Sequence, residues 1–181
     1  MVLFRSVQPA LLRYLTTLGG ALAEDVASET WMSVVRGLDR FSGDEAGWRA
    51  WVFTIARSRL FDAQRRAGRV PVVVASEEEL AARPDGVDVA ERVEEMFSTE
   101  AALALIRRLP PDQAEAVLLR HVAGLDVPRA AKVLGKRAGA VRVAAHRGLR
   151  RLSEMLDQTG DGRSVVGVTE STRPSVPEVR C

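Results

Sequence analysis

The chain of 181 residues is long enough for one ordinary domain or two small ones, and its hydrophobic fraction of 46% excludes wholesale disorder. Its single cysteine excludes an intramolecular disulfide and a cysteine-paired zinc site. The apolar runs of the sequence are too short to span a bilayer, and none precedes a cleavage site near the first residue. We therefore expect a cytoplasmic protein with no membrane insertion and no signal peptide.

The net charge of +2 conceals a segregation of charge along the chain. Residues 1–69 carry 10 basic and 7 acidic side chains, residues 70–98 carry 2 and 8, residues 99–156 carry 11 and 5, and residues 157–181 carry 3 and 4. Two basic blocks thus flank an acidic spacer. Basic blocks are typical of proteins that bind a polyanion, although solvated helix faces would give the same counts.

The first basic block is predicted to form three helices. An amphipathic helix that ends near Gly19 comes first, and apolar residues at helical spacing predict a second helix over 22–38. Turn-forming residues predict a loop over 39–47, and a third helix is predicted over 48–67. The three helices together indicate a small N-terminal helical domain over residues 1–69.

Residues 70–98 are predicted to be a linker, since the segment is acidic and interrupted by proline and glycine. Pro71 argues against a paired strand in the apolar run 70–74, and a short helix around 87–97 is compatible with the sequence. Helices resume near Thr99, and a further helix is predicted over 112–122. The segment 157–181 is rich in Gly, Ser, Thr and Pro, which predicts a disordered tail.

Residues 124–152 carry the most specific pattern in the chain, that of a helix-turn-helix. Asp126 is a good helix N-cap, and Pro128 falls in the first helical turn, where its missing N–H costs little. Gly135 supplies a residue that can take a positive φ and turn the chain, and Gly139 precedes the second helix. Helix, glycine-containing turn and helix is the layout of this DNA-binding unit.

The second helix of this unit has an apolar and a basic side. Its apolar residues recur at steps of three and four, which predicts one buried stripe: Val141, Ala145, Leu149, Leu152 and Leu156. A basic helix that is anchored in this way fits the major groove of DNA, where arginine contacts guanine edges and phosphates. A basic solvent-exposed helix is the alternative. The predicted duplex-contacting residues are Lys136, Arg137, Arg142, His146, Arg147, Arg150 and Arg151.

Three stretches of the chain resemble, in order and spacing, the extracytoplasmic-function (ECF) sigma factors, the smallest class of the main bacterial sigma family. Residues 23–41, from AEDVASETW to LDRF, are similar to the family's polymerase-docking helix. Residues 48–66, from WRAWVFTIAR to DAQRR, resemble the adjoining helix that meets the −10 element. Residues 109–152, which begin LPPDQ, look like its −35-binding domain.

The resemblance implies an all-α protein in which two small helical domains are joined by a flexible acidic linker. It implies that the chain binds core RNA polymerase, at the clamp coiled coil and the flap, and promoter DNA, and that an anti-sigma factor controls it. It assigns polymerase docking to Asp25, Ser28, Glu29 and Met32. It assigns contacts with the melted −10 strand to Trp48, Arg57, Arg59, Arg65 and Arg66, although core packing is an alternative for Trp48 and is favoured for Trp51.

Two other classes of function remain as alternatives. A dimeric helix-turn-helix repressor or activator would use residues 1–98 for dimerisation or ligand sensing and would bind a palindrome without polymerase. An enzyme is disfavoured, because the only histidines are His121 and His146 and no nucleophile–base pair, phosphate loop or metal-ligand spacing is present. We accordingly expect no catalysis, no cofactor, no metal and no small-molecule substrate.

Overall fold

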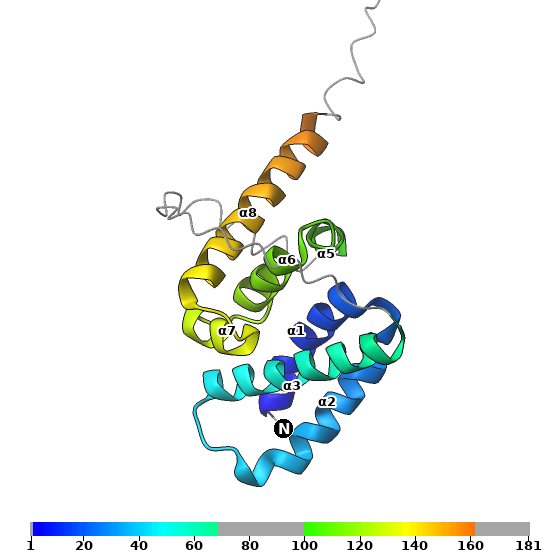
Figure 1. The fold of residues 1–181 in the computed structure, drawn as a ribbon, viewed down its shortest axis with the longest axis vertical. Coiled ribbons are helices and arrows are strands. Elements are labelled where there is room, and N and C mark those ends of the chain that lie inside the picture. The colour runs from blue at the N-terminus through cyan, green and yellow to red at the C-terminus, as the bar shows by residue number, and fades with distance from the viewer. Residues whose placement is uncertain (1, 69–99, 162–181) are drawn as a thin grey trace, which may run out of the picture.

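The computed structural model describes residues 2–68 and 100–161, and every regular element in these two segments is a helix (Figure 1). The N-terminal half consists of α1 (Val2–Gly19), η1 (Gly20–Leu22), α2 (Ala23–Gly37), η2 (Leu38–Arg40) and α3 (Glu45–Arg66). The C-terminal half consists of α5 (Glu100–Ile106), α6 (Pro111–Val117), η3 (Leu118–Val122), α7 (Val127–Leu134) and α8 (Ala138–Asp161). The predicted all-α fold is confirmed for these residues.

The three long helices of the N-terminal half bury one apolar stripe each. Leu11 and Leu15 of α1, Val26 of α2, and Val52 and Phe53 of α3 are at most 1% exposed. Burial of a large apolar side chain contributes about 1.5–3 kcal/mol, so these stripes hold the three helices together.

The third helix begins at Glu45 and not at the predicted residue 48. The carboxylate of Asp44 accepts a hydrogen bond from the Gly47 backbone N–H at 2.7 Å and caps the helix from the residue before it. This carboxylate cap outweighs the low helix propensity of Gly47 in the first turn, which is why residues 45–47 join the helix and the loop is limited to residues 41–44.

In the C-terminal half, α6 runs directly into η3, in which Leu118–Val122 take a wider π-helical turn. The long helix α8 packs across α5 and α6, and its far end projects from the molecule (Figure 1). Residues 157–161 belong to this helix, so the prediction of a disordered tail from residue 157 is wrong for these five residues. Extending an established helix costs little, because each added residue gains a backbone hydrogen bond.

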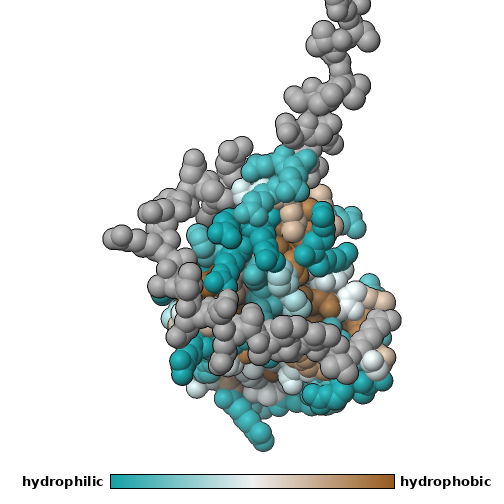
Figure 2. All heavy atoms as spheres, turned by 45° about the horizontal axis from the view of Figure 1, so that its top comes forward, coloured by the Kyte–Doolittle hydropathy of each residue, from teal (hydrophilic) through white to brown (hydrophobic). Residues whose placement is uncertain are grey.

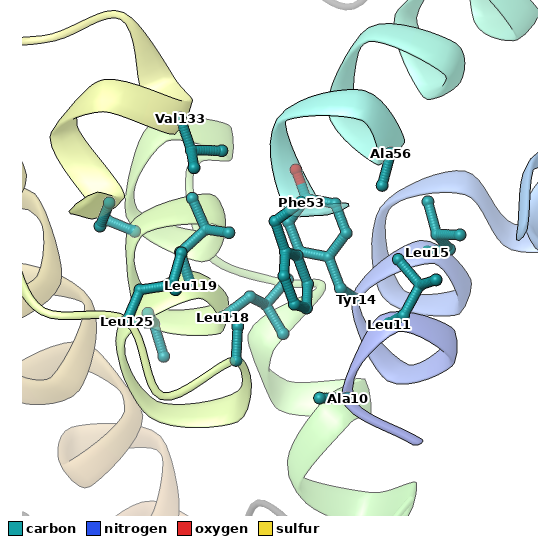
Figure 3. Close-up of a cluster of buried hydrophobic side chains, with 14 of the residues drawn as sticks. Ala10, Leu11, Tyr14, Leu15, Phe53, Ala56, Leu118, Leu119, Leu125 and Val133 are labelled. Carbon is teal, nitrogen blue, oxygen red and sulfur yellow. The ribbon is translucent and has the colours of Figure 1, made fainter. Parts of the chain in front are cut away.

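The two halves share one hydrophobic core. Figure 3 shows Tyr14 and Phe53 of the N-terminal half facing Leu118 and Leu119 of the C-terminal half. All four side chains are fully buried, and the rings of Tyr14 and Phe53 meet edge to face at 5.3 Å. The two helical units are therefore in direct contact. The predicted linker features at 70–74 and 87–97, and the tail from 162 onward, lie outside the described residues.

Candidate nucleic-acid interface

α7 and α8 form the helix-turn-helix that the sequence predicts. Asp126 caps α7 by accepting a hydrogen bond from the Arg129 backbone N–H at 2.8 Å, and this bond is the main cause that lowers the pKa of Asp126. Gly135 ends α7 with a φ of +66°. The Lys136 N–H then reaches back to the Ala131 carbonyl at 3.0 Å, as expected for a left-handed helix cap.

The buried side of α8 is anchored on α6. α8 begins at Ala138, so Gly139, which was predicted to precede the second helix, lies in its first turn. Of the predicted stripe, Val141, Ala145 and Leu152 are buried, whereas Leu149 and Leu156 are half-buried. Because this stripe faces the core, the opposite side of α8 is turned outward. Figure 2 shows hydrophilic side chains gathered over the projecting end of α8.

The seven predicted duplex-contacting cations fall into three groups. Lys136 is set apart, because its ammonium forms an ion pair with Asp112 of α6 at 2.5 Å and fastens the turn to that helix. Arg150 is exposed and also forms a weak surface ion pair with Glu154 at 3.5 Å. Of the other six, four are exposed and two are half-buried: Arg137, Arg142, Arg150 and Arg151, and then His146 and Arg147. We call these six residues the basic face.

The tryptophan predicted to stack on bases lies inside an aromatic cluster at the start of α3. Trp48 is only 6% exposed, and its ring meets Phe41 edge to face at 5.3 Å. Trp51 stacks on Phe41 at 5.1 Å and lies against Gly37, where an added Cβ would come within 2.9 Å of the indole. The buried Trp48 Nε1–H has no protein acceptor among the described residues. The half-buried Phe41 belongs to the turn-rich loop and is the aromatic residue that sequence reasoning did not single out.

Arg57, another predicted −10 contact, is directed at the C-terminal half. Its Nε donates to the Glu115 carboxylate at 2.6 Å, and its guanidinium lies 4.5 Å from the centre of the Phe61 ring. Only 24% of the Arg57 side chain is exposed. In this arrangement the residue is an interdomain contact.

The other three predicted −10 arginines lie together toward the end of α3. Arg59 donates to the Ser33 hydroxyl at 3.2 Å, Arg66 forms an ion pair with Glu29 at 3.3 Å, and Arg65 is exposed. Between α2 and α3 they form an open hollow of about 540 Å³ with an excess of positive charge. Its lining residues are Glu29, Arg59, Asp62, Arg65 and Arg66.

The outer side of α2 exposes large apolar residues. Met32 and Val35 of α2 and Leu38, the first residue of η2, are 52%, 69% and 50% exposed, and the predicted docking residues Asp25 and Ser28 are exposed on α2. Apolar side chains at helical spacing on a surface mark a protein-docking side. We call Met32, Val35 and Leu38 the α2 apolar face; Val35 and Leu38 were not among the predicted site residues, although they continue the spacing of Met32.

Neither a metal-binding cluster nor a membrane span is found in the described segments. Within residues 2–68 and 100–161, no group of three or more His, Cys, Asp or Glu side chains is placed to hold a metal ion. None of the helices described combines the length and hydropathy that a membrane span requires.

Comparison with known proteins matches both halves of the chain to sigma factor domains. Residues 3–70 match the family model of Sigma-70 region 2, and residues 99–152 match that of Sigma-70, region 4. The chain is 36% identical over 167 residues to the ECF RNA polymerase sigma factor ShbA of Streptomyces griseus subsp. griseus, with 86% of each protein covered. It is also 36% identical over 138 residues to the ECF RNA polymerase sigma factor BldN of Streptomyces coelicolor, covering 76% of this chain but only 52% of BldN.

The fold is similar to that of a solved sigma factor. The structure of the sigma factor RpoE in complex with the anti-sigma factor NepR from Bartonella quintana superimposes with a TM-score of 0.56 at 24% identity. The match covers 85% of this chain and 94% of that one.

Proposed function

Because this chain belongs to the family of ECF RNA polymerase sigma factors, we propose that it binds core RNA polymerase and directs promoter-specific initiation by recognising −35 and −10 elements. A dimeric repressor or activator that acts without polymerase is not favoured by this membership. Sigma factors are not catalytic enzymes, and the proposal includes no catalysis and a cytoplasmic site of action, where polymerase meets DNA.

One observation carries the proposal: a single chain presents an apolar docking face and a separate basic face. The α2 apolar face is exposed on the N-terminal half, and the basic face is exposed on the helix-turn-helix of the C-terminal half. An apolar helical side with acidic Asp25 beside it suits a protein partner, whereas a cluster of arginines suits phosphates and guanine edges. A sigma factor needs both.

In the proposed mechanism, the α2 apolar face, with Asp25 and Ser28, docks on the clamp coiled coil of polymerase. The basic face of α8 enters the major groove of the −35 element, and the C-terminal half also contacts the polymerase flap. Docking brings the second DNA contact to a high effective concentration, so neither contact needs high affinity alone. The arginines of α3 hold the unstacked −10 strand, and the half-buried Phe41 is the aromatic residue proposed to stack on its bases.

We also propose an anti-sigma factor as a partner. The support is indirect: the RpoE structure with the same fold holds the anti-sigma factor NepR. The chain presents an exposed apolar side on α2 that a protein inhibitor and polymerase could both use, in which case the two would compete for it.

A pull-down with core RNA polymerase, followed by transcription of a fragmented genomic library with the reconstituted holoenzyme, tests the proposal. We expect binding to core and discrete transcription start sites preceded by shared −35 and −10 sequences. Absence of binding to core would refute the sigma assignment and return the helix-turn-helix to an independent regulator.

A further inference from the structure

A buried polar cluster joins the two halves of the chain. The Tyr14 hydroxyl of α1 donates to the Glu115 carboxylate of α6 at 2.8 Å, and Arg57 of α3 donates to the same carboxylate through Nε at 2.6 Å and Nη2 at 3.4 Å. Tyr14 is fully buried and Glu115 is 8% exposed. We call these three residues the clasp.

The clasp is complete only while the halves are in contact. Glu115 comes from the C-terminal half, and both of its donors come from the N-terminal half. Burial, and then the negative charge of Glu115, raise the pKa of Tyr14, so its hydroxyl remains a proton donor. A buried carboxylate that loses its partners is strongly disfavoured, so the clasp selects this one docking geometry.

A second set of contacts joins the two halves at the start of α3. Arg129 of α7 forms an ion pair with Asp44 at 3.1 Å, and Arg49 donates to the Ala123 carbonyl at 3.4 Å. Asp44 is the residue that caps α3, next to the loop that carries Phe41. The helix-turn-helix therefore lies directly against the end of the N-terminal half that is proposed to meet the −10 strand.

This closed arrangement conflicts with the spacing of promoter elements. The positions −35 and −10 differ by about 25 base pairs, which corresponds to about 85 Å of duplex at 3.4 Å per base pair. α7 and α3 are in direct contact here. α8 contains 24 residues, which at 1.5 Å per residue is a length of about 36 Å. The two reading units cannot serve both elements until they separate.

We propose that the clasp is an autoinhibitory contact. In the free chain the Glu115 carboxylate binds the Arg57 guanidinium, and after the halves separate a phosphate of the −10 strand binds this guanidinium in its place. The role of Arg57 in binding DNA rests on the proposed function, whereas the contact between the two halves does not depend on it. Separation of the halves frees the Arg57 guanidinium and Glu115 at once. The strand and the C-terminal half thus compete for one arginine.

The first test measures the separation of the halves in the free full-length chain. Cysteines for spin labels replace the exposed Ser42 and Ala140 in a Cys181→Ser background, and electron-spin distance measurements are made on the parent, on Glu115→Gln and on Glu154→Gln. Glu154→Gln removes the same charge from an exposed ion pair outside the clasp. We expect one short distance in the parent and the control, and a ratio of extended to closed molecules at least about tenfold higher in Glu115→Gln.

The second test measures competition by a strand. The probe is a fluorescent random-sequence DNA single strand of about 12 nucleotides. Binding should be about tenfold tighter for Glu115→Gln than for Glu154→Gln, with Tyr14→Phe between them, and thermal unfolding by circular dichroism verifies that each variant is folded. Equal affinities of the two glutamine variants, or a parent chain that is already extended, would overturn the proposal. Neither result bears on binding to core polymerase, which tests the proposed function separately.

Discussion

Gly148 of α8 lies so close to Val117 of α6 that a Cβ added to the glycine would come within 2.7 Å of Val117 Cγ2. The same Cβ would lie 3.3 Å from the backbone carbonyl oxygen of Gln113. The absence of a side chain therefore sets how closely the recognition helix approaches the helix that supports it. Because one of the atoms in this contact is a backbone oxygen of α6, a side chain added at Gly148 could be accommodated only if the two helices moved apart.

Gly148→Ala should destabilise the protein by about 1–3 kcal/mol, because the added methyl overpacks the contact between α6 and α8. Urea denaturation measures the loss. Gly139→Ala is the matched control on the same helix, since a Cβ there meets nothing within 4 Å, and it should leave stability unchanged or slightly higher. A Gly148→Ala protein as stable as the control would show that the helices can move apart without cost.

Arg142→Ala should weaken transcription that depends on the −35 element about tenfold while binding to core polymerase survives. Arg142 is exposed on the basic face, and loss of one arginine contact to DNA typically costs about 1–3 kcal/mol. Run-off transcription on a matched promoter and a core-binding assay measure the two effects. Arg5→Ala, at an exposed arginine of α1, is the control and should change neither. Unchanged transcription from Arg142→Ala would remove this residue from the reading surface.

Val35→Asp should reduce the affinity for core polymerase at least about tenfold without reducing stability. Val35 is 69% exposed, so a charge there disturbs no core packing but opposes docking of an apolar partner surface. Affinity is measured by fluorescence anisotropy with labelled protein, and stability by thermal unfolding. Thr54→Asp, at an exposed position of α3, serves as the control. Retention of full affinity by Val35→Asp would place the docking surface elsewhere.

Glu29 offers a sharper question at the same surface, because its carboxylate is held by Arg66 at 3.3 Å. If Glu29 contacts polymerase itself, Glu29→Ala should weaken core binding and Arg66→Ala should not. If the two substitutions weaken binding equally, the ion pair acts by positioning α2 against α3.

Stability should fall as the pH drops through the lowered pKa of Asp126. Its pKa is lowered from 3.8 mainly by the hydrogen bond from the Arg129 backbone, so the charged cap stabilises the folded state above the unfolded-state pKa. Asp126→Asn keeps a capping oxygen but cannot titrate there. The difference in melting temperature between the two proteins should shrink as the pH falls from 6 toward 3. A constant difference would contradict the role of the charge.

Local rules were sufficient for the helix-turn-helix. Asp126 and Gly135 act through hydrogen bonds and dihedral angles of their immediate neighbours, so their roles as N-cap and left-handed C-cap could be predicted from the sequence. The basic face follows in the same way from the periodicity of its apolar partner stripe. The residues of the basic face remain predicted DNA contacts, since their exposure does not identify which of them touch bases.

The contact between the halves could not be predicted. Arg57 and Glu115 are 58 positions apart, and each is a charged residue on a helix, for which exposure to solvent is the ordinary expectation. Trp48 illustrates the converse, because an aromatic residue at the start of a helix fits a base-stacking site and a packed cluster equally well. Only the three-dimensional arrangement, in which Phe41 folds over it, distinguishes the two.

The separation of 58 positions between Arg57 and Glu115 also fixes the order in which they are synthesised. A ribosome adds about 5–20 residues per second, so Arg57 is made about 3–12 s before its partner carboxylate exists. Tyr14 and Phe53 spend that interval without the leucines that later cover them. Until the C-terminal half is made, the N-terminal half of the nascent chain exposes its interdomain surface to chaperones and to neighbouring nascent chains. The speed of translation sets how long that exposure lasts.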